Sequence, residues 1–202
     1  MSEDNRVILR RLDILEAKEQ IQNLVSRHSR GVDRVDPSVT ASIYWPDVRF
    51  TFRGIEKPFV EHVAGENIMD YMGATHHLMG NMIIDLDLDN DRAHVETYAI
   101  AHHRSRPTFD SNAAVVGADN IPNGSANDVL ELIIGIRYLD VMKRRDGIWK
   151  IGERRLVFDW SQLGRYSGIE AGGLYEVTPY RGAQGHADPS YKRPGAKDGA
   201  VI

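Results

Sequence analysis

Two histidines and an aspartate in the first half of the chain have the residue types and spacing that proton-transfer chemistry requires. His77 immediately precedes an apolar run, residues 78–84, which has the length and composition of a largely buried strand. His28 lies on the apolar face of an expected helix, and Asp33 follows shortly after that helix. A histidine in such a place is either a core residue with satisfied hydrogen bonds or a proton-transfer group in a pocket.

An elimination reaction would give each of the three residues a task. Histidine suits the base that removes a C–H proton, because its unperturbed pKa is about 6.5. A carboxylate such as Asp33, bonded to the other ring nitrogen of His77, would fix the tautomer and stabilise the imidazolium that forms. His28 could donate to a departing hydroxyl or to a carbonyl. Spacing alone nevertheless favours the structural interpretation, in which these are ordinary core histidines.

Paired residues on two later strands add further candidates. Adjacent residues of a strand face opposite sides, so one of Arg154 and Arg155 faces inward, as does one of His102 and His103. An inward Arg154 needs an anionic partner or a carbonyl, and a salt bridge at the rim is its alternative. His102 and Tyr98, which share a face, are the substrate-binding candidates from their strand, although the sequence does not decide between His102 and His103.

Metal ions and nucleotide cofactors have little support in the sequence. Four histidines, at positions 76, 77, 102 and 103, could supply two inward ligands, but no His-x-His or helical His-x-x-x-His occurs. Residues 85–90 nearly match a calcium loop, yet Asn90 stands where that loop requires glycine, which favours a hairpin with solvated aspartates. Neither Gly-x-Gly-x-x-Gly nor Gly-x-Ser-x-Gly is present. We therefore predict neither a metal nor a cofactor.

The composition is typical of a soluble globular protein and excludes several classes of function. The net charge of −4 argues against a nucleic-acid partner, which would require a basic patch. The absence of cysteine excludes disulfides, thiolate metal sites and a cysteine nucleophile. No apolar stretch approaches the roughly 18 residues of a membrane span. We expect a cytoplasmic protein with no nucleic-acid or membrane partner.

Hydrophobic periodicity predicts three helices ahead of a sheet. The first helix is expected from a capping box at Asp13 to about Gly31, and the second begins at Asp36-Pro37. A third is expected from Pro58 to Gly73. Strands are expected over residues 48–52, 75–88, 93–103, 129–143 and 148–160, with a break at Trp45-Pro46-Asp47 and a hairpin turn at Arg145-Asp146-Gly147.

The order of these elements predicts an α+β fold. A strongly curved antiparallel sheet wrapped around the three N-terminal helices would form a cone-shaped barrel with one open end, which suits a small-molecule pocket. The connection over residues 107–127 either folds over the pocket mouth or forms a mobile surface loop. Residues 1–160 are expected to form this domain. Residues 161–202 are expected to be an extended tail that packs on the domain or a partner subunit through Tyr166, Tyr175 and Tyr180, with its last dozen residues disordered.

Four local patterns together resemble the SnoaL-like proteins of the nuclear-transport-factor-like cone fold, over about residues 10–160. The patterns are Gly31-Val32-Asp33, Trp45-Pro46-Asp47, Thr75-x-His77-x-x-x-Asn81 and residues 144–150. The family includes scytalone dehydratase, bile-acid 7α-dehydratase and hexachlorocyclohexane dehydrochlorinase. The resemblance implies a cofactor-independent lyase in which His77 is the base and Asp33 its partner.

The resemblance also implies roles for further residues. A polar residue five positions before the catalytic aspartate assists the leaving group in such enzymes, and that position holds His28, where two of the enzymes have lysine or tyrosine. An arginine on the last strand of the dehydrochlorinase matches Arg154. We place Asn81 and Tyr44, with Tyr98 and His102, among the substrate-binding candidates.

The prediction is therefore a dehydratase-type lyase that acts on a small hydrophobic cyclic or aromatic substrate. The alternatives are a deformylating lyase for lignin-derived diaryl compounds, a ketosteroid-type isomerase, and a non-catalytic small-molecule-binding module with the same cone. We also expect a homo-oligomer, either a dimer or a trimer, because a partner usually covers the outer face of the sheet in this family.

Overall fold

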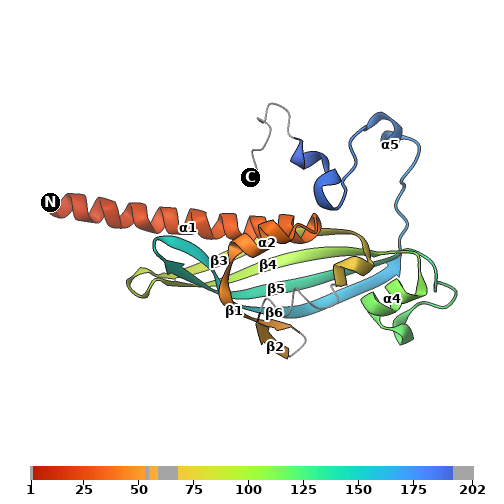
Figure 1. Ribbon diagram of the computed structural model, residues 1–202, viewed down its shortest axis with the longest axis horizontal. Coiled ribbons are helices and arrows are strands. Elements are labelled where there is room, and N and C mark those ends of the chain that lie inside the picture. Colours follow the sequence, from red (N-terminus) through yellow and green to blue (C-terminus); the bar gives the residue numbers. More distant parts are fainter. Residues whose placement is uncertain (1, 53–54, 59–67, 193–202) are drawn as a thin grey trace.

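The computed structural model describes residues 2–52, 55–58 and 68–192, which form two leading helices against a curved sheet (Figure 1). Helices α1 (Glu3–Asp33) and α2 (Pro37–Ile43) precede all the described strands in the chain. The described strands form one six-stranded sheet in the order β2-β1-β6-β5-β4-β3. Their bounds are Tyr44–Phe52 (β1), Ile55–Pro58 (β2), Met72–Asp87 (β3), Arg92–Ser105 (β4), Leu130–Arg145 (β5) and Ile148–Arg165 (β6).

The predicted α+β class is confirmed, with one difference in the pairing of strands. Strands β3 to β6 form the expected antiparallel meander. Strand β1 pairs with β6 in parallel, so the sheet is mixed rather than purely antiparallel. Because β1 enters from α2 and not from a hairpin with β6, no tight turn forces an antiparallel pair there. The break expected at Trp45-Pro46-Asp47 coincides with a register shift in this pairing.

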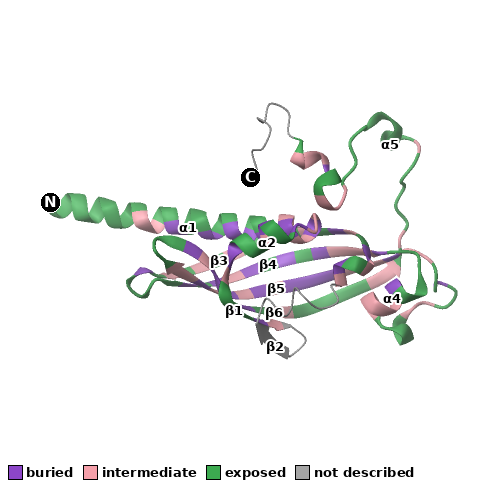
Figure 2. Ribbon diagram, viewed as in Figure 1, coloured by how far each residue is buried: buried purple, intermediate pink, exposed green. Residues whose placement is uncertain are grey.

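The main core lies between one face of α1 and the inner face of the sheet. Ala17, Ile21 and Leu24 recur at helical spacing and pack against strand residues that include Met142 and Trp149. Figure 2 shows this buried face of α1 against the sheet, while the first turns of the helix extend into solvent. The buried face continues along α1 to His28 and Asp33, so the helix that builds the core also carries two candidate site residues.

The helix starts at a different place from the one predicted. It begins at Glu3 with Ser2 as its cap, so the capping box expected at Asp13 is wrong. The Asp13 carboxylate instead accepts a hydrogen bond from Arg144 at 2.7 Å, in the middle of the helix. At the other end, Asp33 is the last residue of α1 rather than part of the connection.

The third predicted helix falls largely on residues outside the described part of the chain. At its ends, Pro58 belongs to β2, and Met72 and Gly73 begin β3 after a short 3₁₀ turn over Ile68–Tyr71. Met72 pairs with Ser105 in the sheet ladder, which fixes it as a strand residue. The apolar spacing that suggested a helix to Gly73 is therefore misleading at this end.

Residues 107–127 contain regular structure at the end of the sheet where β4, β5 and β6 meet (Figure 1). Helix α4 (Phe109–Val116) starts at the cap residue Thr108. The buried Asn112 side chain donates to the carbonyl oxygens of Ser125, Ala126 and Asp128 at 3.0–3.2 Å. These bonds tie the two halves of the connection together, which argues against the mobile surface loop.

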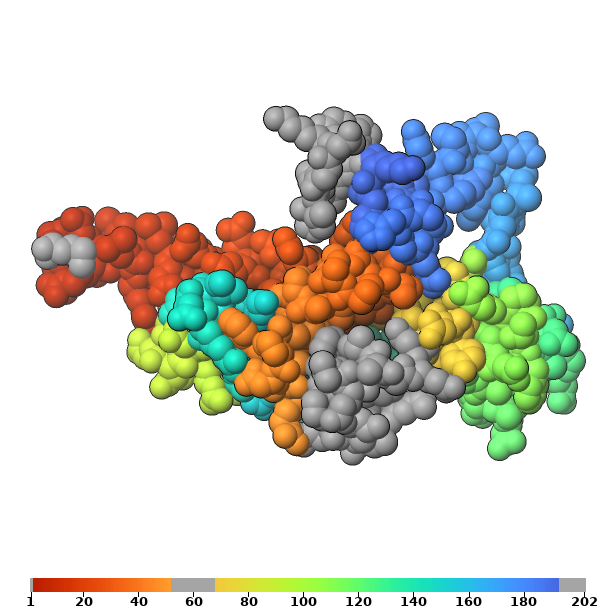
Figure 3. Space-filling view, viewed as in Figure 1, coloured from red at the N-terminus to blue at the C-terminus, as the bar shows by residue number. Residues whose placement is uncertain are grey.

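The tail leaves β6 after Arg165 and returns to the end of α1. Residues near 183–191 rest on the α1–α2 corner in Figure 3, where Arg34 binds Asp188 at 2.7 Å and Tyr191 binds Asp36. Of the three tyrosines expected to pack, Tyr166 lies under Arg104, while Tyr175 and Tyr180 are exposed. The prediction for the last dozen residues falls mainly on 193–202, outside the described residues.

Candidate functional site

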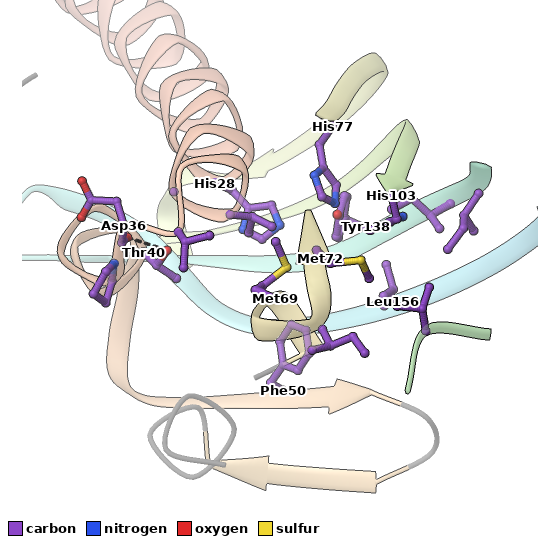
Figure 4. A pocket seen from close by; sticks show the side chains of 18 of the residues that line it. His28, Asp36, Thr40, Phe50, Met69, Met72, His77, His103, Tyr138 and Leu156 are labelled. Carbon is purple, nitrogen blue, oxygen red and sulfur yellow. Dashed lines mark hydrogen bonds between the residues drawn. The ribbon is translucent and has the colours of Figure 1, made fainter. Parts of the chain in front are cut away.

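A cavity of about 460 Å³ lies between the C-terminal end of α1, α2 and the inner face of the sheet (Figure 4). Its volume is in the range of small-molecule sites. Most of its wall is apolar and comes from Phe50, Met69, Met72, Leu132, Ile134, Ile136, Leu156 and Phe158. Three of its polar lining residues are the histidines His28, His77 and His103, and Figure 4 shows their rings directed into the same cavity. The other polar side chains of the wall belong to Asp36, Thr40, Tyr44 and Tyr138.

Asp33 and His77 form a hydrogen-bonded pair at the cavity wall. Alternation along β3 turns Thr75 and His77 inward, against the last residue of α1. The Asp33 carboxylate accepts from His77 Nδ1 at 2.7 Å, from the His77 backbone N–H at 2.9 Å and from the Thr75 hydroxyl at 2.9 Å. Both side chains of the pair are almost fully buried.

The surroundings of Asp33 keep it ionised. Burial alone would raise its pKa, but the hydrogen bonds and charge of His77 and the Thr75 hydroxyl outweigh burial and lower the pKa below its ordinary value. A carboxylate can only accept, so the Nδ1 atom of His77 carries the proton of the shared bond. When the His77 ring is neutral, its Nε2 atom holds the lone pair, and no residue of the described chain bonds to that atom.

His28 lies one turn beyond Leu24 on the buried face of α1, across the cavity from the sheet. Its Nδ1 atom is 3.3 Å from the Tyr44 hydroxyl, and its ring packs nearly perpendicular to that of Tyr138, with centroids 5.1 Å apart. Burial, then the positive charge of Arg154, then His77, holds the pKa of His28 well below its usual range. The ring is therefore neutral at neutral pH.

His103 is the residue of the inward face of β4 that reaches the cavity. Its ring lies perpendicular to that of His77, with centroids 5.3 Å apart, and its Nδ1 atom is buried without a hydrogen-bond partner in the described chain. Burial, followed by the charge of His77, lowers its pKa to about 4. The sequence leaves open whether His102 or His103 faces inward, and His102 is the one placed among the substrate-binding candidates. The small residues Ala99 and Ala101, at odd positions of this strand, are the signal that could have favoured His103.

The even positions of β4 face outward, which corrects the choice of His102 and Tyr98. The His102 side chain is 42% exposed and lies 3.6 Å from Glu131. Tyr98 is 45% exposed, and the Arg137 guanidinium lies over its ring. Both side chains are on the outer face of the sheet, because strand side chains alternate with a period of two.

A β-bulge removes Asn81 from the site. Met79 pairs with Ala99 and Met82 pairs with Thr97, so three steps along β3 match two along β4. The extra residue reverses the alternation, and Asn81 is exposed rather than directed inward like His77. The spacing Thr-x-His-x-x-x-Asn therefore does not bring its asparagine to the cavity.

Arg154 faces inward, but it lies behind the cavity wall. It is 2% exposed, and its Nε and Nη2 atoms each donate to Asp140 at 2.7 Å. Its Nη1 atom donates to the Tyr44 hydroxyl at 3.0 Å. Asp140 is thus the anionic partner that an inward arginine requires, and the rim salt bridge is wrong. Of these residues Tyr44 lines the cavity, so Arg154 reaches it through Tyr44.

Among the described residues, no helix is long and apolar enough to cross a membrane. The same part of the chain has no group of three or more histidine, aspartate or glutamate side chains placed to hold a metal ion.

Residues 13–155 match the family model described as a SnoaL-like domain. Similar solved structures include hexachlorocyclohexane dehydrochlorinase LinA-type3 from Novosphingobium barchaimii LL02, with 20% identity and a TM-score of 0.58 over 80% of this chain and 98% of that one. The Kfla4162 protein from Kribbella flavida has 15% identity and a TM-score of 0.56 over 72% of this chain and 92% of that one. A search of curated proteins gives no match. At these identities, the structural likeness shows the fold alone.

Proposed function

The chain belongs to the SnoaL-like domain family, and on that premise we propose that its cavity catalyses a cofactor-independent elimination, as a dehydratase-type lyase. The observation that carries the proposal is the 2.7 Å bond between His77 Nδ1 and an ionised Asp33, which leaves Nε2 of His77 as a base inside an apolar cavity. The fold shared with a protein named as a dehydrochlorinase supports an elimination.

The bond changes of a dehydration follow from this arrangement. His77 Nε2 takes a C–H proton, and the electron pair of that bond forms the new C=C bond. The hydroxyl on the neighbouring carbon leaves with the electron pair of its C–O bond and takes up the proton that His77 removed, so that water is released and the His77 base is regenerated. Asp33 stabilises the imidazolium between these two events, and His28 faces the substrate with a polar ring nitrogen.

The walls indicate the substrate class. Apolar side chains dominate the cavity, and its volume of about 460 Å³ suits a small hydrophobic molecule with one or a few rings. A ketosteroid-type isomerase would use the same base, because isomerisation also begins with proton removal next to a carbonyl. A deformylating lyase for lignin-derived diaryl compounds is a further variant of the reaction, and a binding module without chemistry is the alternative from another class.

Turnover of a panel of cyclic and aromatic alcohols and ketones, followed by mass spectrometry, tests the proposal. We expect loss of water from at least one compound, and loss of that activity in both His77→Gln and Asp33→Asn. His76→Gln is the matched control, because His76 is the neighbouring histidine on the exposed face of β3. Unchanged turnover in His77→Gln would contradict the dyad, and binding without chemistry would support the binding module.

We also infer that the protein forms a homo-oligomer through the outer face of the sheet. Leu78, Ile83 and Ile100 are 38–59% exposed there, and exposed apolar side chains on neighbouring strands are typical of covered surfaces. Light scattering at several concentrations measures the assembly, and a monomer at all of them would contradict the inference.

A further inference from the structure

A buried chain of polar groups leads from the sheet to His28. Asp140 binds Arg154 through two hydrogen bonds of 2.7 Å, Arg154 donates to the Tyr44 hydroxyl at 3.0 Å, and that oxygen lies 3.3 Å from His28 Nδ1. The Asp140 and Arg154 side chains have no exposed surface. A buried ion pair contributes little net stability compared with an apolar pair, so its retention behind a pocket calls for a further reason.

The direction of each hydrogen bond follows from the chemistry of the groups. Arginine has only donors, so the Tyr44 oxygen accepts from Arg154. The guanidinium charge makes that oxygen a poorer acceptor for a second donor and strengthens the hydroxyl as a donor. Burial raises the pKa of Tyr44 to about 12, so the hydroxyl keeps its proton. The Nδ1 atom of His28, 3.3 Å from the hydroxyl oxygen, can accept that proton.

This direction decides where the proton of the His28 ring lies. A neutral imidazole has one N–H group and one lone pair. If Nδ1 accepts from Tyr44, the lone pair is at Nδ1 and the N–H group is at Nε2. No described residue bonds to Nε2, while the ring lines the cavity. The Nε2–H group is then a hydrogen-bond donor on the ring that lines the cavity.

We propose that Asp140, Arg154 and Tyr44 are positioning residues that hold His28 as a neutral Nε2–H donor, and that the substrate presents a carbonyl oxygen to it. The substrate part of this proposal rests on the proposed function. A neutral ring is a weak acid and does not readily give its proton away, so His28 polarises an oxygen rather than protonating a leaving group. Compounds with a carbonyl next to the C–H bond that His77 attacks are the class that fits.

The reaction balances with these roles. His77 Nε2 removes the proton, and the electron pair of the C–H bond moves toward the carbonyl to form an enolate. The enolate oxygen stays hydrogen-bonded to His28 Nε2–H, which stabilises its charge. The electron pair then returns to expel a hydroxyl from the β carbon, and this hydroxyl takes the proton from His77 and leaves as water. His28 gains and loses no proton in the cycle.

The ¹⁵N spectrum of histidine-labelled protein tests the proposal without any substrate. The two neutral tautomers give different ring nitrogen shifts, and the His28 signals are identified by their loss in His28→Gln. We expect the Nε2–H tautomer in the wild-type protein at neutral pH. In Tyr44→Phe we expect a mixture of tautomers or the Nδ1–H form. Tyr138→Phe is the matched control, since it removes a hydroxyl from a ring that packs against His28 but does not bond Nδ1.

The ion pair needs a separate variant, because removing one partner leaves a buried charge and can prevent folding. The double variant Asp140→Leu with Arg154→Met removes both charges together, and we expect it to fold and to lose the single tautomer. An Nδ1–H form in the wild-type protein, or an unchanged spectrum in Tyr44→Phe, overturns the proposal. These outcomes differ from failure of the proposed function, which would show as absent turnover with the expected His28 spectrum.

Discussion

Asp33 and Asp36 lie three residues apart at the corner between α1 and α2, yet they organise two different regions. Asp33 accepts hydrogen bonds from Thr75 and His77 of the sheet, inside the cavity. Asp36 caps α2 and accepts the hydroxyl of Tyr191 from the tail, at the edge of the same cavity. We call the second region the tail clasp and define it by Arg34, Asp36, Asp188 and Tyr191.

The two regions differ in whether their hydrogen bonds leave a polar atom without a partner among the described residues. In the clasp, Asp188 accepts from Arg34, from the Ala183 backbone N–H and from both donors of Ser190, so its bonds serve only to hold the tail. In the cavity, the bond from His77 to Asp33 uses one ring nitrogen and directs the other toward the pocket. A buried aspartate often serves only to hold two segments together. The cavity differs because the residue bonded to Asp33 keeps a second ring nitrogen that can take up a proton.

The largest expected effect separates the regions by activity. Asp33→Asn keeps the size of the side chain but removes the charge that stabilises the His77 imidazolium, and we expect turnover to fall by roughly 10³-fold or more. Asp188→Asn makes the same chemical change in the clasp, outside the cavity, and we expect turnover close to wild type. Steady-state kinetics of both variants measures the contrast. Equal losses in the two variants would contradict it.

As the pH falls, the cavity histidines should begin to lower the stability of the protein at a higher pH than the carboxylates of the clasp do. The pKa of His103 is lowered from 6.5 to about 4, and that of His28 is lowered as well, so the unfolded chain binds more protons in this range. Stability therefore falls as the pH falls below about 6.5, by about 1.4 kcal/mol per pH unit for each histidine. In the clasp, the pKa of Asp36 is about 2 and that of Asp188 is also depressed. Their contribution is present above the unfolded value of 3.8 and is lost only as the pH falls through the lower folded values.

Urea unfolding of the wild type and of His103→Gln at several pH values between 4 and 7 measures this difference. The groups that face His103 include His77 from β3 and Asp33 from α1, and the variant leaves both in place. We expect the variant to lose less stability than the wild type as the pH falls. Parallel curves for the two proteins would show that His103 is not held neutral by burial.

Sequence reasoning places the buried face of α1 well, including Leu24 and His28, because helical periodicity is a strong signal, but it misses where the helix begins and ends. It fails where a local irregularity or a distant partner decides the outcome. The bulge near Asn81 reverses the alternation of β3. The pattern of residue types in this strand does not show that one residue is extra. Asp140 meets Arg154 only through the strand register, and Asp188 meets Arg34 across 154 positions of sequence. Neither spacing nor residue type predicts such pairs.

The contribution of the clasp can be measured as the stability with which the tail docks on the α1–α2 corner. Asp188→Asn leaves Arg34 with a weaker acceptor at the corner, where the present bond is 2.7 Å, and we expect a loss of about 1–3 kcal/mol in the stability of the docked tail. Hydrogen exchange of the amides of residues 183–191 reports this docking. Glu176→Gln, in the exposed part of the tail, is the control. Unchanged protection in Asp188→Asn would mean that the tail docks by other contacts.

The smallest expected effect compares two tyrosine hydroxyls. Tyr191→Phe removes the bond to Asp36 but keeps the ring against Arg30 and His186, so we expect a loss of about 0.5–1.5 kcal/mol and turnover like the wild type. Tyr44→Phe removes one hydroxyl as well, but that hydroxyl lies between Arg154 and His28. Thermal unfolding and turnover of both variants separate the cases. If Tyr191→Phe reduces turnover as much as Tyr44→Phe does, the clasp is part of the site, and the distinction between Asp33 and Asp36 does not hold.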